Sequence, residues 1–271
     1  MSPNAPQETA LTASEFIRSV MYRIYTDYRD QDYIINMDET PMYFSMAHSK
    51  TLAVAGSRTV NGRQTKNATK RVTVAVTVTA SGKSLKPMVI YEGKPSGRIV
   101  WEFPSYNPGG VYCCQERAWQ NQQTMEFWIR TVLKPYVSTA PVGKIPVLLL
   151  DEYRVHISQP ITNMIQDLGC EVIVIPGGTT CHAQPVDVGV NKPLKVRVKQ
   201  MWDDFLMEQD INSSCFQPPS HSKLVDWIIT AMEQLPTEIV RNAWRHKPFL
   251  YFPWEATGDN NANEDQGTFF I

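Results

Sequence analysis

Two short segments in the second half of the chain are apolar at almost every position. Residues 147–150 read VLLL and end at Asp151, and residues 171–175 read EVIVI and stop at Pro176. A strand with one solvated face alternates apolar and polar residues, so an uninterrupted apolar run is typical of a strand buried on both faces. Such strands occur where helices cover both sides of a sheet. The chain is therefore predicted to be an α/β protein.

The pattern around these segments predicts a hairpin first and strand–helix–strand units afterwards. Residues 71–80 alternate Val with Thr or Ala, residues 81–83 form a turn signal, and residues 86–92 supply the returning strand. A further strand is predicted at residues 33–37, directly before Asp38. Apolar residues at helical spacing predict helices at 14–27, 124–137, 160–168, 188–207, 223–235 and 237–244. This order predicts a mixed sheet covered by helices.

The charge of the chain is small overall but unevenly distributed. A formal net charge of -1 over 271 residues argues at first against a nucleic-acid partner. Residues 45–101, however, contain ten Lys or Arg and one acid, Glu92, which gives a local charge of +9. A second run contains only basic charges (Lys192, Lys195, Arg197 and Lys199). Charge runs are commonly solvated faces, but two of them flanking acidic motifs favour a polyanionic partner.

Membrane and disulfide-rich classes do not fit the sequence. No apolar stretch approaches the roughly 18 residues of a membrane span. The polar N-terminus lacks the basic start and apolar centre of a secretory signal. Five cysteines without a C-x-x-C spacing argue against a disulfide framework and a structural zinc site. The seven tryptophans are expected to pack in the core rather than to stack on bases.

Three aspartates lie in segments that are otherwise apolar or rich in Gly and Pro. Asp38 follows the strand in NMDET, Asp151 follows the strand in LLLDEYRVH, and Asp187 lies in QPVDVGVNKP. Each alone could cap a turn, end a strand or cap a helix. Ligands gather at the carboxyl ends of strands in open α/β sheets. Together the three carboxylates predict a site for Mg²⁺ or Mn²⁺, with two ions sharing the activation of the nucleophile and the stabilisation of the leaving oxygen.

The three acidic motifs, in this order, resemble those of DDE-type transposases and endonucleases. The segments NMDETP, LLLDEYRVH and IPGGTTCHAQPVDVGVNKPLK, with 35 residues between Asp151 and Asp187, resemble in particular the pogo/Tigger/jerky-like branch of the mariner superfamily. The similarity spans residues 32–207 and includes RVTVAVTVTASGKSLKPMVIYEGKP. The resemblance implies an RNase H-like mixed sheet with helices on both faces, plus C-terminal helices. It also implies that Asp38, Asp151 and Asp187 are the catalytic, metal-binding triad.

The resemblance also implies a domain organisation. It predicts an N-terminal helical lead-in at residues 1–30, an RNase H-like catalytic domain at 31–210, a C-terminal helical extension at 211–250 and a disordered tail at 251–271. Relatives usually carry a helix-turn-helix module before the catalytic domain, whereas about 30 residues precede Asp32 in this chain. An isolated catalytic domain is therefore expected. It would act as a homodimer or with a separate DNA-recognition protein.

Two residues near the second aspartate are further candidates for the site. His156, five residues after Asp151, matches a histidine of relatives and is expected to orient a carboxylate or contact the scissile phosphate. A hydrogen-bonded His at a helix start is the alternative. Glu152 stands where relatives often have Asn or Ser, so it adds a carboxylate that either alters metal affinity or points away.

Basic residues are the candidates for contacts with DNA phosphates, which would make binding independent of sequence and sensitive to salt. They are Arg58, Arg63, Lys66, Lys70, Arg71, Lys192, Lys195 and Lys199.

The leading hypothesis is a nuclear, metal-dependent domain that binds DNA and cleaves and transfers its strands; the nuclear location follows from the resemblance. The first alternative is a domesticated, non-catalytic relative that keeps the fold and binds DNA or chromatin. The second alternative is an RNase H-like nuclease that acts on another nucleic acid.

Overall fold

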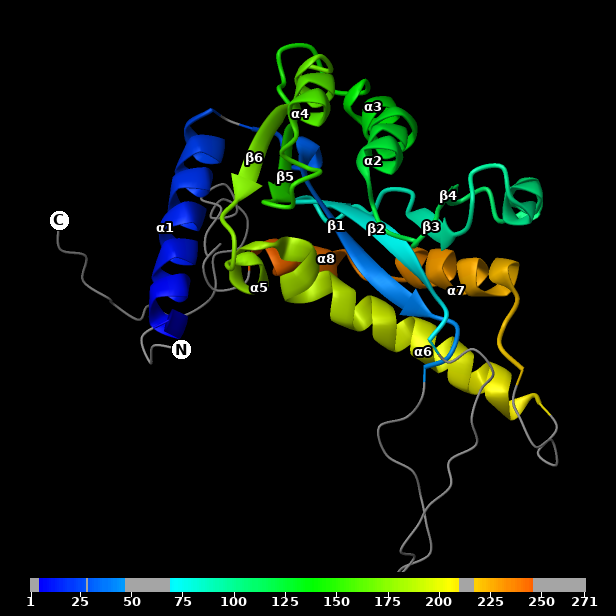
Figure 1. Ribbon diagram of the computed structural model, residues 1–271. Coiled ribbons are helices and arrows are strands. Elements are labelled where there is room, and N and C mark those ends of the chain that lie inside the picture. The colour runs from blue at the N-terminus through cyan, green and yellow to red at the C-terminus, as the bar shows by residue number, and fades with distance from the viewer. Residues whose placement is uncertain (1–4, 28, 47–68, 210–216, 246–271) are drawn as a thin grey trace, which may run out of the picture.

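The computed structural model describes residues 5–27, 29–46, 69–209 and 217–245. A six-stranded mixed sheet forms its centre, and helices surround the sheet (Figure 1). The strands lie in the order β4-β3-β2-β1-β5-β6. Strand β1 pairs antiparallel with β2, and β2 with β3, whereas β3–β4, β1–β5 and β5–β6 are parallel pairs. The strands are β1 Ile34–Tyr43, β2 Arg71–Thr79, β3 Met88–Glu92, β4 Val111–Gln115, β5 Val147–Asp151 and β6 Glu171–Ile175.

Helices cover both faces of the sheet, as the apolar strands predict (Figure 1). In β5, Leu149 packs into one hydrophobic core and Leu148 and Leu150 into the other. The first core contains α1 Ala5–Thr26, α5 Thr180–Ala183, α6 Asn191–Met207, α7 His221–Glu233 and α8 Thr237–Arg245. The second contains α2 Gln122–Trp128, α3 Lys134–Val137 and α4 Gln159–Gln166. The predicted α/β class is confirmed.

Strand β1 is longer than the sequence indicates, and Asp38 lies inside it rather than directly after it. The antiparallel pairing with β2 runs from Ile35 to Tyr43, so the strand continues through Pro41. Beyond Asn36, β1 has a ladder with β2 alone. Proline is tolerated there because a strand with one unpaired edge can lose an N–H donor. The prediction that β1 ends before Asp38 is therefore wrong.

Two predicted helices contain a π-helical turn. The helix expected at residues 188–207 consists of the π-helical turn Val186–Val190 followed by α6. The helix expected at 124–137 consists of α2, the π-helical turn Ile129–Leu133 and α3, where Pro135 lies. Proline cannot donate the usual helical hydrogen bond, and a wider turn before it relieves the conflict.

Strand β4 has no counterpart in the sequence prediction. Its residues are half-buried except for Cys114. The segment VYCCQ therefore shows neither the apolar–polar alternation of a half-buried strand nor the continuous apolar run of a fully buried one. The glycine expected to end the helix before β6 is confirmed, because Gly169 has φ +70°.

The N-terminal and C-terminal helices share one hydrophobic core with the sheet. Ile17 of α1, Ile228 of α7 and Trp244 of α8 are all buried in it. The boundaries predicted at residues 30 and 210 stay predictions, and the tail predicted at 251–271 lies outside the described residues. Among the helices of the described ranges, none is long and apolar enough to cross a membrane.

The contact between α8 and the turn that carries Asp187 is close enough to require a glycine. A Cβ atom added at Gly189 would lie 2.6 Å from the Cβ atom of Ala243. We expect Gly189→Ala to lower the free energy of unfolding by about 1–3 kcal/mol because overpacking forces the two helices apart. Urea unfolding of the single variants and of Gly189→Ala with Ala243→Gly measures the coupling. Additive effects of the two substitutions would contradict the proposed contact.

Candidate active site

Two of the three predicted aspartates lie next to each other because β1 and β5 are parallel neighbours. Their register pairs Asn36 with Leu149, and Asp38 and Asp151 each lie two residues further on. Side chains two residues apart on a strand point to the same face, so both carboxylates emerge on the face of Asn36. Asp38 and Asp151 line one cavity of about 300 Å³. The structure thus brings two of the three predicted aspartates to one cavity, and their role as metal ligands stays a prediction.

The third aspartate reaches the same region from the helical side. Asp187 lies in the π-helical turn before α6, and Asn191 follows one turn later. The Nδ2 atom of Asn191 donates to Oδ2 of Asp38 at 3.3 Å and to Oδ1 of Asp187 at 3.0 Å. One amide group therefore links the two carboxylates. Asp187 is exposed and is not part of the cavity wall that Asp38 and Asp151 form.

A buried asparagine fixes the turn that carries Asp187. Asn36 has no exposed surface, and its Nδ2 atom donates to the carbonyl oxygen of Leu149 at 3.0 Å. Its Oδ1 atom accepts a hydrogen bond from the backbone N–H of Val186 at 3.0 Å. One side chain thus joins β1, β5 and the residue before Asp187. The only signal for this role in the sequence is a polar residue within an apolar strand.

The proximity of the carboxylates changes the electrostatics of Asp38. Burial, followed by the negative charges of Asp187 and Glu39, raises the pKa of Asp38 to about 8. Like charges in a desolvated site cannot all be ionised without a counter-charge. Near neutral pH the carboxyl group of Asp38 therefore holds a proton unless a cation binds beside it.

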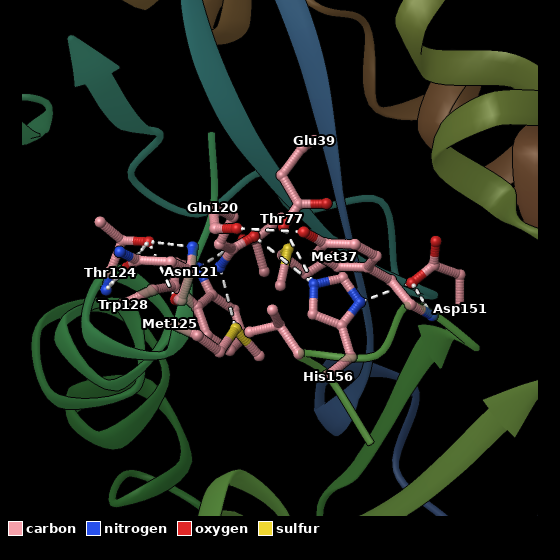
Figure 2. Close-up of polar contacts among 12 residues, drawn as sticks. Met37, Glu39, Thr77, Gln120, Asn121, Thr124, Met125, Trp128, Asp151 and His156 are labelled. Carbon is pink, nitrogen blue, oxygen red and sulfur yellow. Dashed lines mark hydrogen bonds and ion pairs between the residues drawn. The ribbon is translucent and has the colours of Figure 1, made fainter. Parts of the chain in front are cut away.

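His156 connects the second aspartate to β1 (Figure 2). Its Nδ1 atom is 2.5 Å from Oδ1 of Asp151, and its Nε2 atom is 3.0 Å from Oε1 of Glu39. Burial lowers the pKa of His156, but the two carboxylates outweigh it and raise the pKa to about 10. Burial also acts to raise the pKa of Asp151, yet the contact with His156 brings it below its usual value. At neutral pH His156 is therefore protonated, and it lies between the side chains of Asp151 and Glu39.

This arrangement favours the orienting role predicted for His156. The ring has no exposed surface, and both nitrogens face carboxylates rather than the cavity. The sequence gives no indication of the partner Glu39, which directly follows Asp38 in β1 and lines the same cavity as Asp38 and Asp151.

Gln120 extends the chain of polar contacts to the loop before α2 (Figure 2). Its Oε1 atom lies 3.5 Å from Nε2 of His156, at the limit of a hydrogen bond, and its Nε2 atom donates to Sδ of Met125 at 2.9 Å. Asn121 and Thr124 cap the N-terminus of α2 reciprocally. The side chain of Gln120 and the helix cap that follows it therefore both hold this loop in place.

Glu152 points away from the cavity. Its Oε2 atom accepts a hydrogen bond from the backbone N–H of Gly177 at 2.8 Å, so it secures the loop after β6. Of the two outcomes left open for this carboxylate, the structure favours the one in which it does not face the metal.

The predicted phosphate-binding residues divide into three groups. Arg58, Arg63 and Lys66 lie outside the described residues. Arg71 lines the cavity with Asp38 and Asp151, and Lys192 is exposed while Lys195 is half-buried on α6.

The remaining two lysines are engaged within the protein. Lys70 Nζ is 2.8 Å from Nε2 of His221, and Lys199 forms an ion pair with Asp203 at 3.1 Å. Their charges are therefore less available to a ligand than that of Lys192.

The donor set of the site suits a hard divalent cation. In the described part of the chain, no group of three or more His, Cys, Asp or Glu side chains already converges as a metal site. Mg²⁺ commonly takes one or two protein carboxylates and completes its shell with water and substrate phosphates. Asp38 and Asp187, with Asp151 on the same cavity as Asp38, supply such oxygen donors. The residues therefore fit the ion, provided that substrate and water complete the shell.

The order of strands and the helices on both faces define an RNase H-like α/β domain. The family model for the DDE superfamily endonuclease matches residues 69–244, more than half of the chain. The chain therefore belongs to the DDE superfamily endonuclease family.

Similar proteins agree with this family. A Mus musculus protein named Pogo transposable element with KRAB domain is 24% identical over 252 residues, which are 89% of this chain and 40% of that protein. ARS-binding protein 1 of Schizosaccharomyces pombe is 23% identical over 219 residues, or 78% of this chain and 40% of that protein. The chain thus spans about two fifths of the length of these relatives.

Solved structures show the same fold. The mariner Mos1 paired end complex with Mg has a TM-score of 0.57 at 11% identity, covering 89% of this chain and 59% of that chain. The Mos1 paired end complex with Mn has a TM-score of 0.54 at 12% identity, covering 92% and 60%.

The role of Asn36 is open to a direct test. We expect Asn36→Ala to lower the free energy of unfolding by about 2–4 kcal/mol, because it removes the side-chain donor to the Leu149 carbonyl and the side-chain acceptor of the buried Val186 N–H. Asn163→Ala, at an exposed position on α4, is the control and should change stability by less than about 0.5 kcal/mol. Equal losses in chemical denaturation would refute the role of Asn36.

Proposed function

We propose that the chain is a transposase-like endonuclease domain that binds DNA and cleaves and transfers its strands with two divalent metal ions. The observation that carries the proposal is the pairwise proximity of aspartates from separate motifs. Asp38 and Asp151 face one cavity, and Asn191 bonds both Asp38 and Asp187. The membership of the chain in the DDE superfamily endonuclease family supports it.

In this proposal Asp38, Asp151 and Asp187 hold Mg²⁺ or Mn²⁺. When bound, the ions supply Lewis-acid activation of water or a 3′-hydroxyl and stabilisation of the leaving oxygen. Asn191 sets the separation of the carboxylates of Asp38 and Asp187, and His156 orients that of Asp151. Arg71, on the wall of the same cavity, neutralises a phosphate close to the carboxylates.

We further propose a nuclear location and an assembly in which a second copy or another protein contributes to DNA recognition. The names of the relatives, which include a pogo transposable element protein and an ARS-binding protein, support a function on chromosomal DNA. The similar Mos1 structures are paired end complexes, which supports a paired assembly.

Replacement of the aspartates tests the catalytic assignment. We expect Asp38→Asn, Asp151→Asn and Asp187→Asn each to reduce Mg²⁺- or Mn²⁺-dependent nicking of plasmid DNA by at least about 100-fold, since each removes an anionic ligand. Chelation with EDTA should abolish nicking by the unaltered chain, and added Mn²⁺ should restore it.

Asp167→Asn, at an exposed position directly after α4, is the matched control and should retain full activity. Full activity in Asp38→Asn or Asp151→Asn would refute the assignment. DNA binding by the unaltered chain without any metal-dependent nicking would instead support the domesticated, non-catalytic alternative. A preference for RNA or an RNA–DNA hybrid over DNA would support the second alternative.

The basic residues near the cavity make a separate prediction about binding. We expect Arg71→Gln and Lys192→Gln each to weaken binding to duplex DNA of any sequence and to reduce the slope of log affinity against log salt by about 1. Lys134→Gln, on the opposite helical layer, is the control and should leave the slope unchanged. Fluorescence anisotropy over a salt series measures the slopes, and identical slopes in all variants would contradict the predicted phosphate contacts.

A further inference from the structure

An exposed tryptophan lies on the wall of the candidate active site. Trp119 is 56% exposed and lines the cavity together with Asp38 and Asp151. Core packing is the expected role of tryptophan, and Trp128 and Trp244 in this chain are fully buried. The large apolar ring of Trp119 is thus open to solvent on the same cavity wall as Asp38 and Asp151. It is therefore a candidate for ligand contact.

The loop holds this ring in a fixed place. The Oε1 atom of Gln115 accepts hydrogen bonds from the backbone N–H groups of Arg117 at 2.7 Å and of Trp119 at 3.1 Å. Ala118, between them, is buried and has φ +52°, the one positive φ among the described non-glycine residues. Left-handed backbone at alanine costs about 1 kcal/mol and persists where the surroundings enforce it. The turn that positions Trp119 therefore contains a strained backbone conformation at Ala118.

The same loop is connected to the second aspartate. The hydroxyl group of Tyr153 donates to the carbonyl oxygen of Gln120 at 3.3 Å, and the backbone N–H of Tyr153 donates to Oδ1 of Asp151 at 3.2 Å. The loop and the carboxylate are therefore joined through one residue. The distance between the ring of Trp119 and the reacting phosphate would be set by these contacts.

The positively charged side chain of Arg71 lies next to the ring of Trp119. The guanidinium carbon of Arg71 lies 5.5 Å from the centroid of Trp119, within the range of a cation–π contact. A flat aromatic surface with an adjacent positive charge suits a nucleotide, because the base stacks on the ring while the phosphate meets the guanidinium group. At about 300 Å³ the cavity is at the lower limit for small-molecule sites, so it fits a single nucleotide rather than a duplex.

We propose that Trp119 is a stacking platform for one unpaired base of the DNA strand next to the phosphate that is cleaved, and that Arg71 binds the phosphate of that nucleotide. This inference rests on the proposed function, because it assumes that DNA enters the cavity. It adds a requirement that the three aspartates do not impose: the substrate strand must be locally unpaired at this position.

Fluorescence of a modified base tests the proposal directly. The probe is a duplex with a short single-stranded overhang that carries 2-aminopurine at the first unpaired position, in Ca²⁺ so that the strand stays intact. We expect the full chain to quench the probe, since stacking on tryptophan quenches 2-aminopurine, and Trp119→Ala to bind it roughly 5- to 100-fold more weakly without quenching. Trp119→Phe, which keeps an aromatic ring, should recover part of the affinity.

Two controls separate stacking from a general loss of structure. Trp101→Ala removes a ring that is 82% exposed but does not line the cavity, and it should bind the probe like the unaltered chain. An abasic analogue at the probe position should weaken binding by the unaltered chain and leave Trp119→Ala unaffected, so that the two proteins bind abasic DNA equally.

Two results would overturn the proposal: equal binding of the 2-aminopurine probe by Trp119→Ala and the unaltered chain, or the same loss on abasic DNA as on the probe. In either case normal binding of duplex DNA would leave the proposed function intact. Failure of the unaltered chain to bind any of these DNAs would overturn both.

Discussion

The parallel pairing of β1 with β5 is the constraint on which the rest of the site depends. It pairs Asn36 with Leu149, and Asp38 and Asp151 follow two residues later on their respective strands. Asn36 completes the arrangement, since its two hydrogen bonds connect this strand pair to the turn of Asp187. An error of one residue in the register would turn one of the two carboxylates to the opposite face. The relative placement of Asp38 and Asp151 is therefore a property of the sheet rather than of the loops.

The close approach of buried carboxylates in this site lowers the stability of the folded protein. Burial of Asp38 close to Asp187 disfavours ionisation of Asp38, and the pKa of Asp38, raised to about 8, reflects the penalty. His156 compensates on the other side, where its positive charge lies between Asp151 and Glu39. The site thus contains a histidine between two carboxylates and a buried aspartate, Asp38, that needs a proton or a cation. Such local conflict with folding rules is typical of functional sites.

The sequence carries much of the fold and the identity of the acids, but not their mutual placement. Strands β5 and β2 could be predicted because their burial leaves a local pattern in the sequence. This pattern is an apolar run in β5 and alternating Val in β2. The extension of β1 through Pro41 depends on its partner β2, and the burial of Asn36 depends on Val186, far along the chain. Glu39 and Asn191 are residue types that are common on protein surfaces, so nothing in the sequence marks them. Their roles follow from tertiary contacts with His156 and Asp38. Trp119 was expected in the core, and its exposure follows from the conformation of the loop.

The polar contacts around His156 connect parts of the site that would otherwise be independent. Gln120 approaches His156 through its side chain and accepts from Tyr153 through its backbone, so the loop of Trp119 and the carboxylate of Asp151 share two links. A shift of the loop would therefore displace the carboxylate of Asp151. Reorientation of Asp151 on binding a cation would in turn displace the loop. Coupling of this kind travels through packed and hydrogen-bonded neighbours that move together. Base contact and metal binding would then be interdependent steps, which would favour ion binding when the strand to be cleaved already occupies the cavity.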